Sequence, residues 1–562
     1  MQKPVIVFDQ FSFRYDSQQE NTLNNINLTI YEGQKVLILG QSGSGKSTLI
    51  HCINGLIPFS YPGTITGSCR VAGMETTHAS IFSLSQEVGT VLQDSDAQFV
   101  ALSVEEDVAF ALENQAISRD LMIPKVKQAT DKVGMTDFLK QVPFNLSGGQ
   151  KQKVSMAGVL HENVNILLFD EPLASLDPLS GYQTIDLIDQ IHRDNKTILI
   201  VEHRLEEVMV KSIDRVIVMH NGGITFDGSL EALLRKNILS QVGLREPLYL
   251  QALRLARIDY YHRNNIHNVN EINLEDIKDL ASHFKIKDKQ TNDKERDTLL
   301  EVNHVSFAYD KQNVINDVCF DIKRGERIAF IGKNGAGKST MAKLICGFVR
   351  PNQGEIRLNK MNILAMSIRE IGEKIGFVMQ NPNQMLVKHL IRDEISFALI
   401  QHRFTIDEIE ARVTEALKIC DLYSMRNWPV SAVSYGQRKR ITVAAILALK
   451  PDILILDEPS SGQDYTHYSE IMDFLDALNK EHGVTFIFIT HDMHLAIEYT
   501  DRAIVFSDSR IIADDYIHQI MSNRDIIDKA NLKQTSLYDL AHKIGVSPQS
   551  VIQYFIENRR SI

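Results

Sequence analysis

The stretch Gly40-Gln41-Ser42-Gly43-Ser44-Gly45-Lys46-Ser47-Thr48 decides how this chain folds. It follows the apolar run Val36–Leu39 and precedes Leu49 and Ile50, so the expected order is strand, glycine-rich loop and helix N-terminus. The glycines let backbone N–H groups turn toward a chain of phosphates. The lysine can reach the terminal phosphates, and the serine after it can ligate Mg²⁺. The pattern therefore predicts a nucleotide-binding loop.

The same stretch recurs as Gly332-Lys333-Asn334-Gly335-Ala336-Gly337-Lys338-Ser339-Thr340. Lys338 lies 292 residues after Lys46 (338 − 46). Other landmarks recur at nearly the same separation, namely Gln93 and Gln380, Ser147 and Ser434, Glu171 and Glu458, and His203 and His491. The sequence therefore predicts a duplicated domain rather than two unrelated loops.

Composition narrows the class of protein. The chain has 562 residues, which is too long for one core, and it is 44% hydrophobic and 23% charged. A net charge of −11 argues against nucleic acid as a bulk partner. The five cysteines are scattered and form no CxxC pair, so we expect neither disulfides nor a zinc site. We see no signal peptide and no apolar run long enough to cross a bilayer, so a membrane role requires docking onto other subunits.

Apolar patterning predicts the fold class. Each copy opens with alternating segments typical of antiparallel strands: Val5–Phe8, Phe11–Tyr15, Leu300–Val302 and Val305–Tyr309. Strongly apolar runs typical of covered parallel strands follow at Asn165–Phe169, Ile198–Val201, Ile453–Leu456 and Phe486–Ile489. We expect two tandem α/β domains at 1–235 and 298–526. Each has a wound, mostly parallel sheet, an antiparallel β portion and a helical part.

The remaining segments are expected to be a linker at 236–297 and a small helical tail at 527–562. Leu244–Ile258 has leucines near helical spacing, whereas His262–Asn273 is rich in asparagine and Phe284–Asp297 is mixed in charge, as in exposed linkers. In the tail, Leu537–Phe555 has helix–turn–helix spacing with Gly545 in the turn. DNA binding is one interpretation. The favoured one is a helical appendage packed on the second domain, because the recognition segment is poor in Lys and Arg.

Two further motifs carry chemistry. Asp170-Glu171 ends an apolar strand and Asp457-Glu458 repeats it. The first acid can hold Mg²⁺ and the second can polarise an attacking water, although charge at a helix N-terminus is the alternative. The segment Leu146-Ser147-Gly148-Gly149-Gln150, followed by a helical stretch, forms a second anion-binding surface. If the two surfaces lie at opposite ends of a domain, a partner domain has to bring one of them to the nucleotide.

In their order, these motifs resemble the ATPase domain of the ABC family. The first set comprises Gly40–Thr48, Gln93, Leu146–Gln150, Asp170-Glu171, Ala174–Asp177 and His203. The second set comprises Gly332–Thr340, Gln380, Val433–Gln437, Asp457-Glu458, Ser461–Asp464 and His491. Together they cover most of the chain outside the linker and the tail.

The resemblance implies a role for each position. Tyr15 and Tyr309 are similar to the aromatic residues that stack on adenine, although a tyrosine on a strand face is the alternative. The two glycine-rich loops, with Lys46 and Lys338, hold phosphates. Ser47, Ser339, Asp170 and Asp457 serve Mg²⁺, and Gln93 and Gln380 sense Mg²⁺ and the attacking water. Glu171 and Glu458 correspond to general bases, and His203 and His491 to contacts of the γ-phosphate.

The family's head-to-tail dimer implies that one chain forms its own pair of ATP sites. One ATP would lie between the first domain's loop and Ser434 with Gly436, and the other between the second loop and Ser147 with Gly149. The copies differ at two positions. Tyr435 replaces the first glycine of the second signature, and Gln463 stands where leucine is usual. We expect both sites to bind ATP, and the site that combines Ser147 with Glu458 to be the stronger hydrolase.

Gln93–Asn114 and Val201–Glu207 resemble the ATPases of energy-coupling-factor importers, and Gln380–Leu399 is related to the former. A soluble mechanical ABC ATPase acting on ribosomes or DNA is the alternative, but neither a basic helical linker nor a zinc-binding cysteine cluster is present. The resemblance implies a transmembrane coupling subunit and a separate membrane subunit that captures the substrate. It implies a peripheral location on the cytoplasmic side of the cell membrane, with no nucleic acid partner. The cargo would be a vitamin, a precursor such as the hydroxymethylpyrimidine of thiamine, or cobalt or nickel.

Overall fold

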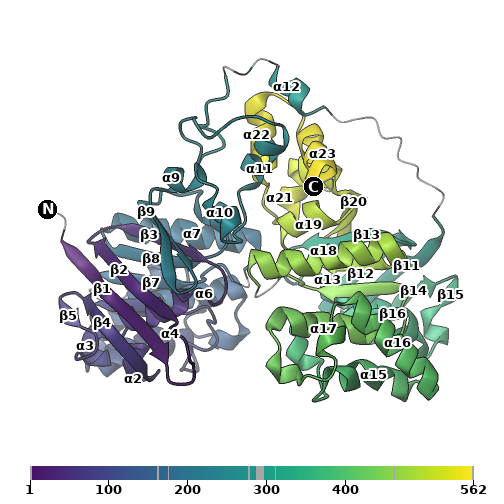
Figure 1. Ribbon diagram of the computed structural model, residues 1–562, viewed down its shortest axis with the longest axis horizontal. Helices are drawn as coiled ribbons and strands as arrows, with labels where there is room; N and C mark the ends of the chain where they lie inside the picture. Colours follow the sequence, from purple (N-terminus) through teal and green to yellow (C-terminus); the bar gives the residue numbers. More distant parts are fainter. Residues whose placement is uncertain are drawn as a thin grey trace. The chain divides into compact units, whose positions relative to one another are not determined.

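The computed structural model describes residues 3–160, 164–174, 176–275, 277, 279–285, 296–310, 312–460 and 463–559. The chain divides into two compact units. The first comprises Met1–Arg254 with Ile258–Asp276, and the second comprises Leu255–Arg257 with Ile277–Ile562. Each unit contains one copy of the repeated motifs, and Figure 1 traces the elements of both.

The first unit is built around a sheet of strand order β10-β9-β3-β8-β7-β6. Its strands are β3 (Lys35–Gly40), β6 (Val88–Val91), β7 (Ile166–Asp170), β8 (Thr197–Glu202), β9 (Arg215–His220) and β10 (Gly223–Gly228). All neighbours in this order are parallel except β9 and β10. Every residue of β3, β7 and β8 is buried, as the continuous apolar runs predicted. Because these strands are parallel, their carboxyl ends meet at one edge.

A second sheet in this unit, of order β2-β1-β4-β5, is antiparallel. Its strands are β1 (Pro4–Tyr15), β2 (Leu23–Tyr31), β4 (Gly63–Val71) and β5 (Met74–Glu75). The two predicted strand segments at its start, Val5–Phe8 and Phe11–Tyr15, belong to one strand, because β1 is continuous through a bulge. The pairing with β2 shifts from Phe8 opposite Leu28 to Phe11 opposite Ile26, and Gln10 has φ +46°. The bulge supplies extra residues without ending the strand.

The helices of the first unit include a group of three that pack against one another. The group consists of α4 (Val104–Asn114), α5 (Arg119–Val133) and α6 (Gly148–Leu160), of which α6 also contacts β6. The others are α1 (Lys46–Ile53), α2 (Leu56–Phe59), α3 (Ile81–Ser85), α7 (Pro178–Arg193), α8 (Leu205–Val208), α9 (Leu230–Leu234), α10 (Ile238–Gln241) and α11 (Leu248–Leu255), with 3₁₀ turns at Thr136–Phe138 and Pro143–Asn145.

The second unit repeats this architecture. Its sheets have the orders β12-β11-β14-β15 and β16-β17-β18-β13-β19-β20. The strands are β11 (Thr298–Tyr309), β12 (Gln312–Lys323), β13 (Arg327–Gly332), β14 (Gln353–Leu358), β15 (Met361–Asn362), β16 (Ile375–Val378), β17 (Ile453–Asp457), β18 (Thr485–Ile489), β19 (Arg502–Ser507) and β20 (Arg510–Tyr516). Strand β11 also runs through a bulge, where His304 has φ +50°. The predicted α/β class is therefore confirmed for both copies.

A corresponding group of helices packs together in the second unit: α15 (Ile391–Gln401), α16 (Ile406–Ile419) and α17 (Tyr435–Leu447). The others before the tail are α12 (Leu280–His283), α13 (Lys338–Ile345), α14 (Ile368–Lys374), α18 (Tyr465–His482), α19 (Met493–Tyr499), α20 (Ile517–Ser522) and α21 (Arg524–Lys529). Short 3₁₀ turns lie at Ile363–Ala365, Pro382–Gln384, Tyr423–Met425 and Val430–Ala432. In Figure 1, α15–α17 and the tail helices lie on opposite sides of this unit.

The segment between the copies is less exposed than predicted. Its helix α11 spans only Leu248–Leu255 of the expected Leu244–Ile258. Within the asparagine-rich stretch, Ile266 and Ile272 are buried, and the Tyr249 hydroxyl donates a hydrogen bond to the Ile266 carbonyl. The few apolar residues among the asparagines are enough to fold this stretch onto the first unit. Most of the predicted charge-mixed stretch, residues 286–295, lies outside the described residues.

The C-terminal tail packs on the second unit, as the favoured interpretation predicted. It forms α22 (Ser536–Ile544) and α23 (Pro548–Arg559), separated by Gly545 at φ +67°. Helix α23 buries Val551 and Phe555 and contacts α19 and α20. At its end, the Arg559 guanidinium lies 3.0 Å from the buried carboxylate of Glu498. Among the described residues, no helix has the length and apolar character needed to span a membrane.

Candidate nucleotide sites

The glycine-rich loop of the first unit connects β3 to α1. Gly43 and Gly45 have φ values of +78° and +100°, a conformation that glycine adopts without strain. The Lys46 ammonium donates hydrogen bonds of 2.8 Å to the carbonyls of Gly40 and Gln41, so it lies across the loop. The amide groups of the first turn of α1 and this ammonium are donors of the kind that the predicted phosphate site requires.

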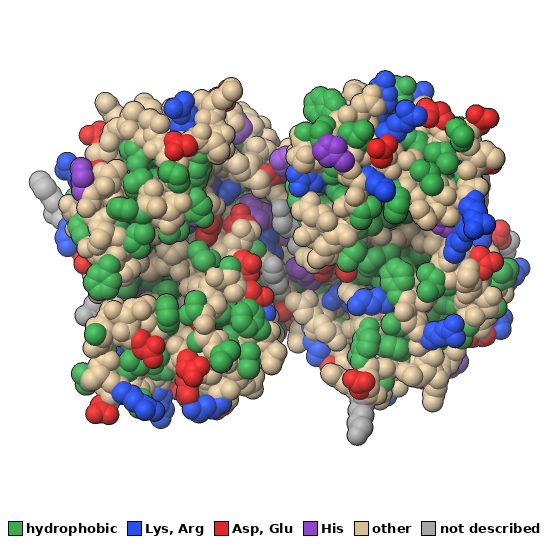
Figure 2. Space-filling view, turned by 90° about the horizontal axis from the view of Figure 1, so that it is seen from below, with side chains coloured by type: hydrophobic (Ala, Val, Ile, Leu, Met, Phe, Trp, Pro, Cys, Tyr) green, Lys and Arg blue, Asp and Glu red, His purple; other side chains and the backbone are tan. Residues whose placement is uncertain are grey.

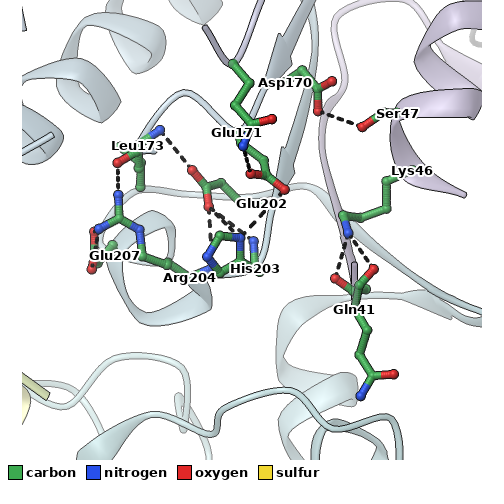
Figure 3. Close-up of polar contacts among 12 residues, drawn as sticks. Gln41, Lys46, Ser47, Asp170, Glu171, Leu173, Glu202, His203, Arg204 and Glu207 are labelled. Carbon is green, nitrogen blue, oxygen red and sulfur yellow. Dashed lines mark hydrogen bonds and ion pairs between the residues drawn. The ribbon is translucent and has the colours of Figure 1, made fainter. Parts of the chain in front are cut away.

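Asp170, at the end of β7, lies beside this loop. Its Oδ1 accepts a hydrogen bond of 3.4 Å from the Ser47 hydroxyl (Figure 3). Burial and the neighbouring Glu171 charge raise the pKa of Asp170 to about 6, because Lys46 and Ser47 offset them only in part. A carboxylate and a hydroxyl that lack sufficient positive charge fit a hard divalent cation such as Mg²⁺. The residues present are therefore compatible with Mg²⁺ at the predicted position.

Glu171 lies between Gln93, which is predicted to sense Mg²⁺ and the attacking water, and His203, which is predicted to contact the γ-phosphate. The Gln93 amide donates a hydrogen bond of 2.5 Å to Glu171 Oε2, and His203 Nδ1 lies 3.8 Å from Oε1. Burial would raise the pKa of Glu171, but His203 and Lys46 outweigh it and lower the pKa. Burial likewise opposes protonation of His203, but the carboxylates of Glu171 and Glu202 raise its pKa. At this site the glutamate is held as the anion, which is the form that accepts a proton from water.

Glu202 and Arg204 lie within the segment Val201–Glu207, but the sequence analysis gave neither of them a role at the site. The fully buried Glu202 carboxylate accepts hydrogen bonds of 2.9 Å from the Leu173 amide and 3.1 Å from the His203 amide. Arg204 donates to the Leu173 carbonyl (Figure 3). These contacts tie the loop after Glu171 to the loop that carries His203. A charged residue at the end of an otherwise apolar strand, immediately before a candidate histidine, was the available signal.

The second unit repeats the site with different contacts. The Lys338 ammonium donates hydrogen bonds of 2.7 and 2.9 Å to the carbonyls of Gly332 and Lys333. Burial and the Glu458 charge raise the pKa of Asp457 to about 6. The ring Nδ1 of His491 lies 2.8 Å from Glu458 Oε1, which is hydrogen-bonding distance. The histidine and the candidate base are therefore closer in this unit than in the first.

Lys439 is a further residue that the sequence analysis missed. Its side chain is completely buried in α17, and the ammonium donates a hydrogen bond of 3.1 Å to the carbonyl of Pro459. Burial lowers the pKa of Lys439 to about 8, although the carboxylates of Glu458 and Asp457 counteract the effect. The sequence signal that could have identified it is the lysine itself, since the first copy has Gln152 at the corresponding position.

The signature serines lie at the exposed starts of α6 and α17. The Ser434 hydroxyl accepts a 3.2 Å hydrogen bond from the Gln437 amide, and the Gln437 side chain accepts one of 3.0 Å from the Ser434 amide. Ser147 and Gln150 make the same reciprocal pair. This arrangement caps each helix and fixes its first turn at the surface. The assignment of each signature to the opposite nucleotide stays a prediction.

The two tyrosines end β1 and β11. Tyr15 is half-buried, with its hydroxyl 3.1 Å from the Thr48 hydroxyl, which places it beside the phosphate-loop helix. Tyr309 is 42% exposed and packs edge-on against Phe307. Both positions are compatible with a predicted adenine platform. In the segments Ala174–Asp177 and Ser461–Asp464, the residues Ser175, Ser461 and Gly462 lie outside the described residues.

Together, a glycine-rich loop after a central parallel strand, a lysine across it and two acids at the neighbouring strand end define a duplicated ATPase of the phosphate-loop class. A family model described as "ABC transporter" matches residues 23–174 and 315–461. A second, described as "ATP-binding cassette cobalt transporter", matches residues 236–307, which include the segment between the copies.

Curated relatives align over the whole chain. A putative ABC transporter ATP-binding protein of Clostridium perfringens, CPE1583, is 49% identical over 99% of this chain and 98% of its own length. One of Enterococcus faecalis is 48% identical over 100% of both chains. A solved structure of cbiO1 from Clostridium perfringens, titled as part of the ABC transporter complex cbiONQ, is 32% identical, covers 44% of this chain and 100% of its own, and has a TM-score of 0.40.

The chain belongs to the ATP-binding proteins of ABC transporters. It is therefore an ATPase whose hydrolysis is coupled to transport, and the predicted family is confirmed.

The geometry predicts two nucleotide sites per chain that can be removed separately. Lys46→Ala and Lys338→Ala should each reduce the number of ATP molecules bound from two to one, and the double variant should bind none. Removal of a charged phosphate donor should weaken binding at the altered site by at least about tenfold. Calorimetric titration with ATP measures the stoichiometry.

Lys343→Ala is the matched control, because Lys343 is an exposed lysine on the same helix as Lys338. It should bind as the unaltered chain does. Retention of both sites by either single variant would contradict the assignment of these lysines.

Proposed function

We propose that this chain is the ATP-hydrolysing subunit of an importer of the energy-coupling-factor type. It docks on the cytoplasmic side of the membrane onto a separate transmembrane coupling subunit, and a further membrane subunit captures the cargo. The family match supports the transport role. The matched description of a cobalt transporter favours a transition-metal ion as cargo over a vitamin or a vitamin precursor such as hydroxymethylpyrimidine.

The observation that carries the docking proposal is an exposed apolar loop that follows each glutamine. In the first unit, Val100 and Leu102 are 62% and 82% exposed. The Asp107 carboxylate accepts hydrogen bonds from the amides of Val100 and Ala101, at 2.9 and 3.2 Å. The loop is thus fixed in shape while its apolar side chains face outward, which is typical of a protein interaction site.

The second unit has an exposed apolar loop that is fixed in the same way. Val387 is 65% exposed, and the Glu394 carboxylate accepts hydrogen bonds from the amides of Val387 and Lys388, at 2.9 and 2.6 Å. Figure 2 views the molecule from the side on which α15 lies in Figure 1, and it shows hydrophobic side chains exposed on this face. Because each loop follows Gln93 or Gln380, a change at the nucleotide can reach the docking surface through a short segment of chain.

The residues of each site divide the reaction among them. The loop amides with Lys46 or Lys338 bind the phosphates of ATP. Asp170 or Asp457, with the serine of the loop, would hold Mg²⁺, which neutralises phosphate charge when bound. Glu171 or Glu458 orients the attacking water and accepts its proton, and in the first site His203 helps to keep the Glu171 carboxylate ionised.

We further propose that each site is completed by the signature of the opposite copy, with Ser434 and Gly436 serving the first loop and Ser147 and Gly149 the second. The exposed, capped serines support this arrangement, because a helix start fixed at the surface can present its amides to an anion. One chain then supplies both halves of both sites.

The docking surface should be separable from nucleotide binding. A Leu102→Ser, Val387→Ser double variant should reduce co-purification with membrane subunits by at least about tenfold, since two exposed apolar contacts are lost. ATP binding should not change. The measurement is affinity purification from detergent-solubilised membranes, with identification of the co-purified proteins and of the bound small molecule.

Ile368→Ser is the matched control, because Ile368 is 65% exposed on α14 and belongs to neither loop. The importer proposal fails if the unaltered chain purifies with ribosomes and no membrane subunit. The docking surface is refuted if the double variant retains its membrane partners.

The two candidate bases should contribute unequally to turnover. Glu458→Gln should lower steady-state ATPase activity more than Glu171→Gln does, because Glu458 is within hydrogen-bonding distance of its histidine and is paired with the unaltered signature at Ser147. The measurement is the steady-state rate of phosphate release from ATP by each of the two variants. Equal losses, or a larger loss for Glu171→Gln, would refute this asymmetry.

A further inference from the structure

The second unit differs from the first at three positions that converge in space. Counted from the signature serine, Tyr435 stands in place of Gly148, and Lys439 in place of Gln152. Counted from the aspartate that begins the following helix, Gln463 stands in place of Leu176. In each case the second copy carries the larger side chain or the one with an added hydrogen-bond donor.

Tyr435 and Lys439 are one helical turn apart on α17 and therefore share a face. The Tyr435 hydroxyl donates to the carbonyl of Gln380 at 3.3 Å, and the Lys439 ammonium lies 3.5 Å from the same oxygen. The helix that begins after Ser434 is thus joined to the backbone of the very glutamine that is predicted to sense the nucleotide.

A second carbonyl, that of Pro459, completes the group. It accepts hydrogen bonds from the Lys439 ammonium at 3.1 Å and from the Gln463 amide at 3.4 Å. Pro459 follows the candidate base Glu458 directly. Lys439 therefore bridges the loop after β16 and the loop after β17 from a completely buried position.

The first unit holds its corresponding loop differently. Gly148 has no side chain, and the Gln152 side chain accepts a 2.7 Å hydrogen bond from the Ser95 hydroxyl. The residue that corresponds to Ser95 in the second unit is Pro382, which has no hydroxyl. In the first unit the signature helix thus bonds to Ser95, two residues after Gln93. In the second unit it bonds to the backbone of Gln380 itself.

A buried ammonium is costly unless its surroundings compensate it, and replacement by an apolar residue is often neutral for stability. A contribution to folding stability therefore does not explain why a lysine occupies position 439. Its two acceptors, by contrast, belong to the two segments whose relative position governs hydrolysis, namely those of Gln380 and Glu458.

We propose that Tyr435, Lys439 and Gln463 form a clamp that positions Gln380 and Glu458 for hydrolysis in the second unit. The clamp joins the Gln380 loop, the Glu458 loop and the signature helix into one block, so that they move together. Its side chains act through the backbone carbonyls of Gln380 and Pro459. The inference rests on the proposed hydrolytic roles of Gln380 and Glu458.

The test uses the full chain with Glu171→Gln, so that the remaining turnover reports the second unit. In this background, Lys439→Met should lower kcat about tenfold and Tyr435→Phe about threefold, as expected for loss of a charged and a neutral hydrogen-bond donor. The KM for ATP should stay within about twofold, because nucleotide binding by the Lys338 loop is intact. Hydrogen–deuterium exchange of residues 379–386 should accelerate in both variants.

Arg440→Met is the matched control, because Arg440 lies on the same helix and pairs with the half-exposed carboxylate of Glu470. It should leave kcat and exchange unchanged. The clamp is refuted if kcat and exchange are unaltered in both clamp variants. It is also refuted if kcat falls only together with a raised KM and a lowered unfolding midpoint, which would indicate a structural role.

Failure of the proposed function has a different signature. If the Glu171→Gln chain hydrolyses no ATP, Glu458 is not the base of a working site. The exchange measurement then still decides whether Tyr435 and Lys439 hold the Gln380 loop.

Discussion

The structure depends on the parallel pairing of the central strands, which brings a lysine and two carboxylates to one sheet edge. In the first unit, β3 ends at the loop of Lys46 and β7 ends at Asp170, with Glu171 immediately after it. These charges are tolerated near the core because they compensate one another and because ATP and Mg²⁺ have complementary charge. Burial and the neighbouring glutamate raise the pKa of Asp170 and of Asp457 to about 6, although a lysine lies beside each of them.

Both copies place a lysine and two carboxylates at this sheet edge, but the contacts around these residues differ. The lysines make equivalent contacts with their loops, at 2.7–2.9 Å in both units. The histidines do not, since His491 is 2.8 Å from Glu458 but His203 is 3.8 Å from Glu171. Glu202 organises the first site, whereas Lys439 lies behind the second. We therefore propose that duplication preserved nucleotide binding and let the hydrolytic machinery of the two sites diverge.

Much of this was predictable from the sequence. Loop glycines, strand-end acids and apolar runs are local signals, and the repeat established that they belong together. The bulges at Gln10 and His304 were missed because a bulge leaves both flanking segments alternating. The burial of Ile266 was missed because composition averages over a stretch and hides single apolar residues. The sequence showed Glu202 and Lys439 as unusual residues but not their roles, because these depend on backbone groups that are distant in sequence.

The central claim is that one chain holds two ATP sites that hydrolyse at different rates. The most direct measurement is a single-turnover experiment, in which the purified chain is loaded with ATP and the phosphate formed is quantified over time after rapid quenching. The account predicts two ATP molecules hydrolysed per chain in two phases of unequal rate, with one molecule in each phase. A single phase, or a total of one ATP per chain, would contradict it.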